Sequence, residues 1–552
     1  MRPPDAMAQA PAPARNPWLV LLVLNLGFFM ILLDTTIVNV AIPSMIDGLK
    51  ASLDQILWVL NSYLLVYAVL LITAGRLGDI YGPRNLIAAG LLIFIASSAV
   101  CGLAQDPNQL IAARIVQGVG GALLTPQTLA IINSIFPPER RGAAFGIWGA
   151  VAGVAAVAGP TLGGWLTTDF TWRWIFYVNL PIGIVALLGS FLIVPDLRPG
   201  RRHRLDVAGV LMSSLGLFLV VFGLIEGQRY DWGVIWWQIN IYEVIAAGVA
   251  IFVVFLFWER YVDEPLVPLS LFRNRNFTLM NWVTICLAFG MFGLFLPISI
   301  YLQSVLGLSA LAAGLTLAPM AGTSMFVAPV AGRMSDRIGG KYILMTGLAL
   351  FALGMGLVAH VAGPASTWHD FIPFLIISGF GMGCIFAPMT TVAMRNIEPR
   401  MAGAASGVFN TTRQVGAALG SSVVGAVLQA GLVTHMHDQA VSRASQVPAP
   451  FRTRFVDAFS SAGQHGLSVG RGQGGAAFQF PPGVTAQVKQ MLLQLGHDVF
   501  VNGYIDAMRQ SLLVPVVAMA IASASCLLIQ KVRQADAAAA VERDRLRAVA
   551  ET

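Results

Sequence analysis

Charge is what this sequence has least of. Of its 552 residues, 11% are charged and 56% are hydrophobic. Soluble domains carry about a quarter charged residues, and a soluble chain of this length would divide into several domains, each with a charged surface. The composition therefore excludes a soluble protein and predicts an all-α integral membrane protein that crosses the bilayer many times.

Cysteine is also scarce. The four cysteines stand far apart within apolar stretches and form no CxxC pair, so neither a disulfide scaffold nor a cysteine metal site is expected. The sequence likewise lacks a GxxxxGK[ST] phosphate loop, a zinc-binding helix and a serine nucleophile elbow. These absences argue against an enzyme or an ATP-driven pump, and we expect no cofactor and no metal.

Apolar segments of about 20 residues recur along the chain, each long enough to cross about 30 Å of hydrocarbon as a helix. We expect fourteen spans, at 18–43, 55–74, 86–104, 110–133, 143–166, 174–194, 206–226, 239–258, 277–302, 311–331, 342–362, 371–394, 403–431 and 504–530. Residues 1–17 and 531–552 are expected to be tails, the first of them disordered. A long, solvated outer loop is expected at 434–503; His435 and His437 lie there without a convincing set of metal ligands.

The basic residues indicate an orientation. If the amino terminus is cytoplasmic, 23 arginines and lysines fall on the cytoplasmic side, and only Lys50, Arg173 and Arg229 fall in short outer loops. Both termini are therefore expected in the cytoplasm. The net charge of +7 is then a topology signal, and nucleic acid is not an expected partner. The excess of arginine over lysine suggests a bacterial coding sequence rich in GC, hence a bacterial cell membrane.

Two sequence echoes indicate an internal duplication. Residues 75–84 and 332–341 share Gly, Arg, Asp, Gly and a final basic residue at the same offsets, 257 positions apart. Residues 142–146 (GAAFG) and 403–407 (GAASG) repeat at an offset of 261. Two echoes at nearly one offset indicate a duplicated unit.

The duplication predicts the domain organisation. We expect a six-helix bundle at 18–194, two inserted helices at 206–258 and a second six-helix bundle at 277–530. This is the layout of a secondary transporter, with its substrate site between the halves at mid-membrane.

The repeated loop resembles the signature of the major facilitator superfamily. The fourteen spans, LDTTIVNVAIP at 33–43 and WRWIFYVNLPIG at 172–183 are similar to its fourteen-span drug:proton antiporter branch. The resemblance implies a major-facilitator-like fold and export of hydrophobic or amphipathic compounds driven by inward proton flow. Its expected partners are the substrate, protons and the bilayer, and we expect a functional monomer.

Asp34 lies inside the first predicted span. An acid there costs about 2.5–3.5 kcal/mol, so it must face a wet cavity or a partner. We interpret Asp34 as a proton carrier at the substrate cavity; the alternative is a helix-packing carboxyl bonded to Asn39 or to a neighbouring span. Asn39 is included in the candidate cavity.

Arg114 and Gln117 lie in the fourth predicted span. A guanidinium stays charged, so Arg114 can hold Asp34 ionised if the two helices are adjacent; the alternative is a tether to backbone carbonyls. The resemblance assigns the matching Arg and Gln to a proton-coupling motif. The repeat places apolar residues opposite both charges, with Met291 opposite Asp34. The fold alone therefore does not require the charges, which favours a functional role.

The repeated loops are interpreted as a cytoplasmic gate formed by Gly75, Asp79, Gly82 and Arg84 in the first copy and by Gly332, Asp336 and Gly339 in the second. Each Asp is expected to cap a helix or pair with a basic group of the other half. Breaking these contacts would be one step of alternating access.

Two further features complete the candidate site. Gly159, Pro160, Gly163 and Gly164 resemble the antiporter motif of the family, a bent packing seam in the fifth span. Arg413 lies at membrane depth and is a candidate cavity residue, although it could also lie near the cytoplasmic end. Glu226 is expected at the cytoplasmic end of 206–226 and is given no role.

Uptake of a small nutrient by proton symport is the alternative function.

Overall fold

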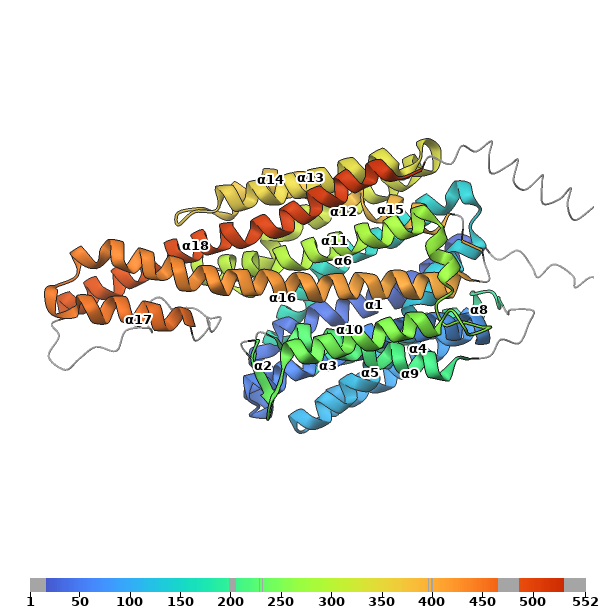
Figure 1. Cartoon of the computed structure of the whole chain (residues 1–552), viewed down its shortest axis with the longest axis horizontal. Coiled ribbons are helices and arrows are strands. Elements are labelled where there is room, and N and C mark those ends of the chain that lie inside the picture. Colours follow the sequence, from blue (N-terminus) through green and yellow to red (C-terminus); the bar gives the residue numbers. More distant parts are fainter. Residues whose placement is uncertain are drawn as a thin grey trace, which may run out of the picture.

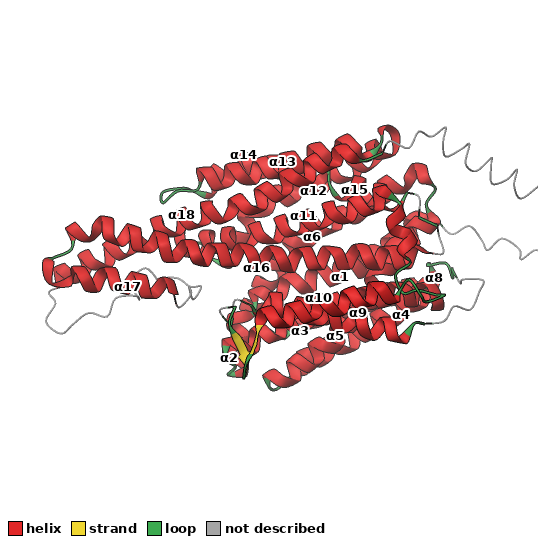
Figure 2. Cartoon of the chain, in the orientation of Figure 1, coloured by secondary structure: helices red, strands yellow, loops and turns green. Residues whose placement is uncertain are grey.

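Helices form almost the whole structure, with one short antiparallel strand pair (Figure 2). The computed structural model describes residues 16–197, 205–227, 229–230, 232–395, 397–398, 401–464 and 486–530. Most of the predicted tails, the basic residues at 198–204 and the glycine-rich stretch at 469–476 lie outside these residues.

The first half contains long antiparallel helices whose starts are fixed locally. Four of them begin with proline, which lacks the N–H that a helix start would leave unpaired, and α3 begins with a capping box between Ser52 and Gln55. The helices are α1 (Pro17–Val40), α2 (Ile42–Leu49), α3 (Leu53–Tyr81), α4 (Pro83–Leu103), α5 (Pro107–Ile135), α6 (Pro138–Asp169), α7 (Trp174–Tyr177) and α8 (Asn179–Leu192).

The inserted pair is α9 (Val207–Glu226) and α10 (Ile241–Trp258), joined through strands β1 (Val234–Trp236) and β2 (Ile239–Asn240). A 3-10 helix, η1 (Leu269–Arg273), leads into the second half. Helix α9 packs against α3 of the first half and also contacts α16 of the second half. The insertion therefore covers one seam between the halves.

The second half repeats the plan of the first. It contains α11 (Arg275–Ile300), a π turn (Tyr301–Val305), α12 (Ala310–Ile338), α13 (Gly340–Val361), α14 (Trp368–Gly383), α15 (Phe386–Met394), α16 (Ala402–Arg443), 3-10 turns at Ala444–Gln446 and Ala449–Phe451, α17 (Arg452–Gln464), α18 (Ala486–Ser525) and η7 (Cys526–Leu528). The halves meet where α6 lies along α12 and α3 along α16. We call the end of the molecule that carries both repeated loops the loop end.

The predicted membrane spans are confirmed. Thirteen helical segments of the described chain are long and apolar enough to cross a bilayer, and α6 packs between α1 and α12 beside them. Together they match the fourteen expected segments. The long apolar runs settle this part of the fold, because a bilayer accepts them only as helices.

The prediction of a loop over 434–503 is wrong for the described residues. Helix α16 continues to Arg443 and α18 begins at Ala486, so both project beyond the other helices, with α17 packed against them (Figure 1). A small apolar core that includes Val447, Phe455 and Phe459 holds this projection together. His435 contacts the Gln510 amide oxygen at 3.0 Å, a contact between α16 and α18.

Candidate functional site

Asp34 lies at the centre of a buried polar cluster formed by four helices of the first half. Its side chain is 0% exposed. Arg114 Nη1 lies 2.5 Å from Asp34 Oδ2, and the amide groups of Gln117 and Asn179 donate to Oδ1 at 3.0 and 2.9 Å. The carboxylate thus has three donors, one of them permanently charged, which compensates its removal from water.

Arg114 is enclosed just as fully. Its Nε donates to the Val59 carbonyl oxygen of α3 at 3.2 Å, and Nη1 also donates to Gln117 Oε1 at 2.7 Å. The Tyr63 ring lies 4.2 Å from the guanidinium carbon, a cation–π contact. Arg114 therefore pairs with Asp34 and also donates to a backbone carbonyl oxygen; its role in holding Asp34 ionised stays a prediction.

The sequence analysis missed two members of the cluster. Ser98 accepts from Gln117 and Asn179 at 3.3 and 3.1 Å and donates to the Phe176 carbonyl oxygen. Asn179 belongs to the WRWIFYVNLPIG segment, which was used for the family resemblance without a role for its asparagine. A polar amide within an apolar span was the available signal.

The structure corrects two expectations about this cluster. Asp34 faces partner groups within one half, so in this conformation it does not line a substrate cavity. Asn39 is exposed and donates to the Thr35 carbonyl oxygen, so it is not the partner of Asp34. Arg413 is half-buried on α16 and makes no hydrogen bond or ion pair with any described residue; its role at the cavity stays a prediction.

The last turns of α3, which contain most of the first repeated segment, reach across to the second half. Asp79 accepts the backbone N–H groups of Gly403 and Ala404, both at 2.9 Å. These donors belong to the first turn of α16, which has no partner for them within the helix. The carboxylate therefore caps a helix of the opposite half, as the sequence analysis proposed as one of two options.

The second repeated segment makes the equivalent contact in the opposite direction, from the second half to the first. Asp336 accepts the N–H groups of Gly142 and Ala143 near the start of α6, at 2.7 and 3.1 Å. A side chain on Gly332 would overlap the Gly142 carbonyl oxygen, just as one on Gly75 would overlap that of Gly403. Each copy of the loop thus packs glycine against glycine across the halves.

The remaining loop residues also act in matching ways. Gly82 and Gly339 end their helices at φ values of 87° and 86°, a conformation that favours glycine. Arg84 donates to the Phe191 carbonyl oxygen at the end of α8 at 2.8 Å, and Lys341 donates to that of Ile529 beyond α18 at 3.1 Å. Each basic residue caps the last long helix of its own half.

The glycines of the predicted antiporter motif lie between α6 and its neighbours. A side chain on Gly159 would overlap Thr36, and one on Gly163 would come within 2.9 Å of Ile37. Gly164 faces Leu311 of α12 in the second half. The Pro160 side chain lies outside the described set. The motif therefore forms a close seam between α6 and the part of α1 that follows Asp34.

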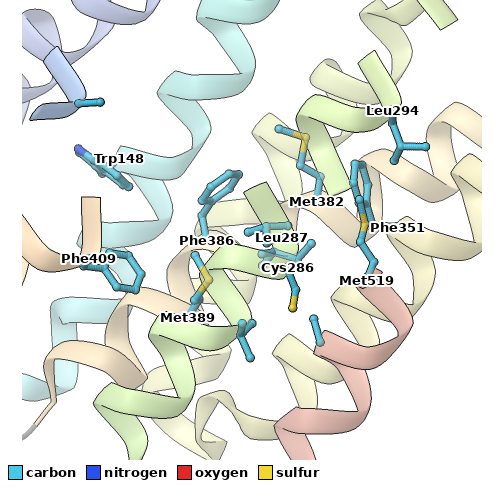
Figure 3. Close-up of a cluster of buried hydrophobic side chains, with 14 of the residues drawn as sticks. Trp148, Cys286, Leu287, Leu294, Phe351, Met382, Phe386, Met389, Phe409 and Met519 are labelled. Carbon is cyan, nitrogen blue, oxygen red and sulfur yellow. The ribbon is translucent and has the colours of Figure 1, made fainter. Parts of the chain in front are cut away.

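The halves share an apolar seam of buried side chains. Trp148 of α6 belongs to the same buried hydrophobic cluster as Phe386 of α15 and Phe409 of α16 (Figure 3). Phe28 of α1 stacks on Trp148 at a centroid distance of 4.3 Å. The side chains that would be exposed if the halves parted here are aromatic or aliphatic, which suits an apolar ligand.

A second acidic cluster lies at the loop end of the inserted helices. Glu259 is 3% exposed and accepts the Val267 N–H at 2.9 Å. Burial raises the pKa of its carboxyl from 4.5 to about 7, the Val267 hydrogen bond opposes this rise, and the Asp206 carboxylate adds to it. Arg76 of the first gate loop lies 3.8 Å from Glu264 beside this group.

This pKa predicts how stability depends on pH. Between pH 4.5 and 7 the folded chain holds the Glu259 proton and the unfolded chain releases it, so the free energy of unfolding falls as the pH rises through this window, by at most about 3 kcal/mol. Unfolding of the detergent-solubilised protein as a function of pH measures it. The Glu259→Gln variant should lose this slope; an unchanged slope would contradict the assignment.

Glu226 lies at the end of the molecule opposite the loop end, which corrects its expected place. It is 2% exposed, accepts from the Asn61 amide of α3 at 3.2 Å and pairs with Arg229 at 3.1 Å. The Ser422 hydroxyl of α16 donates to the neighbouring Leu224 carbonyl oxygen. This end of α9 is thus bonded to both halves.

Comparison with known proteins agrees with this architecture. Residues 24–421 match the family described as Major Facilitator Superfamily. The chain is 42% identical over 424 residues to an uncharacterized MFS-type transporter of Mycobacterium tuberculosis (76% of this chain and 72% of that protein). It is 35% identical to the puromycin resistance protein of Streptomyces alboniger (80% and 88%) and 30% identical to multidrug resistance protein 3 of Bacillus subtilis (93% and 95%).

A solved structure shares the fold. The crystal structure of a human organic anion transporter superposes with a TM-score of 0.57 at 16% identity, covering 75% of this chain and 94% of that one. The membrane-spanning helices, the duplicated halves and the family match lead to one conclusion: the chain is a multi-pass membrane transporter that belongs to the Major Facilitator Superfamily.

Proposed function

We propose that this transporter exports hydrophobic or amphipathic compounds from a bacterial cell in exchange for protons. The substrate class rests on the relatives, several of which are named for resistance to, or export of, antibiotics and other drugs. The apolar seam around Trp148 and Phe386 supports the same class, because it offers aromatic surface to a ligand.

The observation that carries the transport cycle is the pair of crossed helix caps. Asp79 and Asp336 each bind a helix of the other half, and the distribution of arginine and lysine favours a cytoplasmic location for the loop end and both termini. The structure then corresponds to a state closed toward the cytoplasm. Release of both caps would let the halves rock apart there and admit substrate.

The Asp34 cluster is the proposed coupling centre. Its partners lie on α4, α5 and α8, whereas α6 packs on the adjoining turn of α1 through Gly159. Because Asp34 is sealed in this conformation, it can exchange a proton only after α1 shifts relative to these helices. Protonation of Asp34 would weaken its contact with Arg114. The close packing of α1 against α6 would transmit that change toward the interface between the halves. Substrate does not touch Asp34 in this state.

Dye efflux from proteoliposomes with and without an imposed pH gradient tests this function. Wild type should transport dye across the membrane only when the pH gradient is present. Asp34→Asn should lose this gradient-driven transport, because an amide cannot carry the proton. Asp47→Asn, on the exposed short helix α2, is the matched control and should transport normally.

Two outcomes would contradict the proposal separately. Efflux that persists after collapse of the gradient would remove proton coupling. Gradient-driven efflux by Asp34→Asn would leave coupling intact and remove Asp34 as the carrier.

A further inference from the structure

A groove lies on the outer surface of the second half at the loop end. It has a volume of about 410 Å³ and is formed by η1, the first turns of α11 and η7, with Arg273, Arg275, Leu279, Trp282 and Leu528 among its lining residues. The Thr278 hydroxyl donates to the Phe272 carbonyl oxygen at 2.8 Å and holds η1 against α11.

The mouth of the groove is basic. Arg273 and Arg275 are both exposed, and neither makes an ion pair or hydrogen bond with any part of the chain that the structure describes. They flank the point where α11 begins, so their charges add to the positive end of the helix dipole. Two free guanidinium groups within one groove favour a phosphate or carboxylate ligand.

The interior of the groove is apolar and points along the membrane-spanning part of α11. Trp282 lies seven residues beyond Arg275, which is roughly 10 Å along a helix, and is 48% exposed. Its indole N–H donates to Ser525 Oγ at 3.2 Å, which fixes the ring against α18. Leu528, 54% exposed, also lines the groove. Basic groups therefore stand at the end of the span and apolar side chains toward its middle.

We propose that this groove is a binding site for an anionic phospholipid. The headgroup phosphate would bind between Arg273 and Arg275, and one acyl chain would lie along Leu279, Trp282 and Leu528. A bilayer supplies this ligand at the depth where the groove lies, and basic pockets beside membrane helices bind anionic headgroups. Free inorganic phosphate shares the headgroup chemistry but would leave the apolar part of the groove unoccupied.

Titration of the purified full-length protein with phosphatidylglycerol in neutral detergent tests the site, with bound lipid counted by native mass spectrometry and the unfolding temperature recorded in parallel. Arg273→Gln combined with Arg275→Gln should weaken binding roughly 30-fold, since each basic residue near an anionic surface contributes about 1 kcal/mol and 1.4 kcal/mol is tenfold. Arg260→Gln, an exposed arginine at the same end that stacks on Phe257, should bind like wild type.

Further variants and ligands test whether the groove binds an anionic phospholipid. The double lysine variant at 273 and 275 keeps the charge and should retain most of the binding; a loss equal to that of the glutamine variant would overturn the proposal. Phosphatidylcholine should bind no more tightly to wild type than to the double glutamine variant. Equal loss in Arg260→Gln, or stabilisation by inorganic phosphate equal to that by phosphatidylglycerol, would also overturn it.

Discussion

Replacing Arg114 by leucine is expected to destabilise the protein by roughly 3–5 kcal/mol, because the substitution leaves the Asp34 carboxylate buried without its charged partner. Asp34 is 0% and Arg114 1% exposed, so water cannot replace the lost contact. Unfolding of the purified protein in mixed detergent micelles measures the loss. Arg413→Leu is the matched control: it removes a half-buried arginine of α16 that has no partner among the described residues, and the cost should be much smaller.

The double variant Asp34→Asn with Arg114→Leu separates charge pairing from packing. If the ion pair dominates, the double variant should recover a large part of the stability that Arg114→Leu loses, since no uncompensated charge remains. Additive losses would show instead that Arg114 acts mainly through Val59 and Tyr63. Transport should remain absent in the double variant even where stability returns.

Gly75→Val is expected to reduce efflux by roughly fivefold or more, by opening the loop end. The new side chain would overlap the Gly403 carbonyl oxygen across the halves, and such overpacking costs about 1–3 kcal/mol. That cost falls only on the closed state, so the population of this state should drop. Distances between spin labels on the loop ends of α3 and α16 should lengthen as efflux falls.

Gly322→Val provides the control for this prediction. Gly322 lies within α12, and a side chain there would meet nothing within 4 Å. The variant should keep the wild-type distance distribution and efflux. A Gly75→Val protein with wild-type distances would show that the glycine pair is not needed for closure.

The sequence predicted the helices and identified the two repeated segments because both depend on strong, local signals. Apolar runs of bilayer length permit little except helices, and the two echoes identified the duplicated segments. The sequence analysis did not foresee that the echoes bind each other crosswise, the loop at 75–84 against 403–407 and the loop at 332–341 against 142–146. A repeat reveals which segments correspond, but contacts between copies depend on how the halves pack.

Other features escaped prediction for physical reasons. The Asp34 cluster draws Ser98 and Asn179 from helices far apart in the sequence, and a single polar residue in an apolar span does not indicate its partner. The helical projection at 432–464 and 486–503 was taken for a loop because its polar composition lacks a membrane signal. Its core forms only when Phe455 of α17 meets α16 and α18.

Because α16 is long, a small tilt of the second half would produce a large displacement of the projection. The helix runs without a break from Gly403, which Asp79 binds, to Arg443 in the projection, and its 42 residues span roughly 60 Å. A rigid rod of that length converts a tilt of about 10° into a displacement of about 10 Å at its far tip. A fluorophore or antibody fragment attached there would register each swing of the second half from outside the bilayer, without any label near the substrate path.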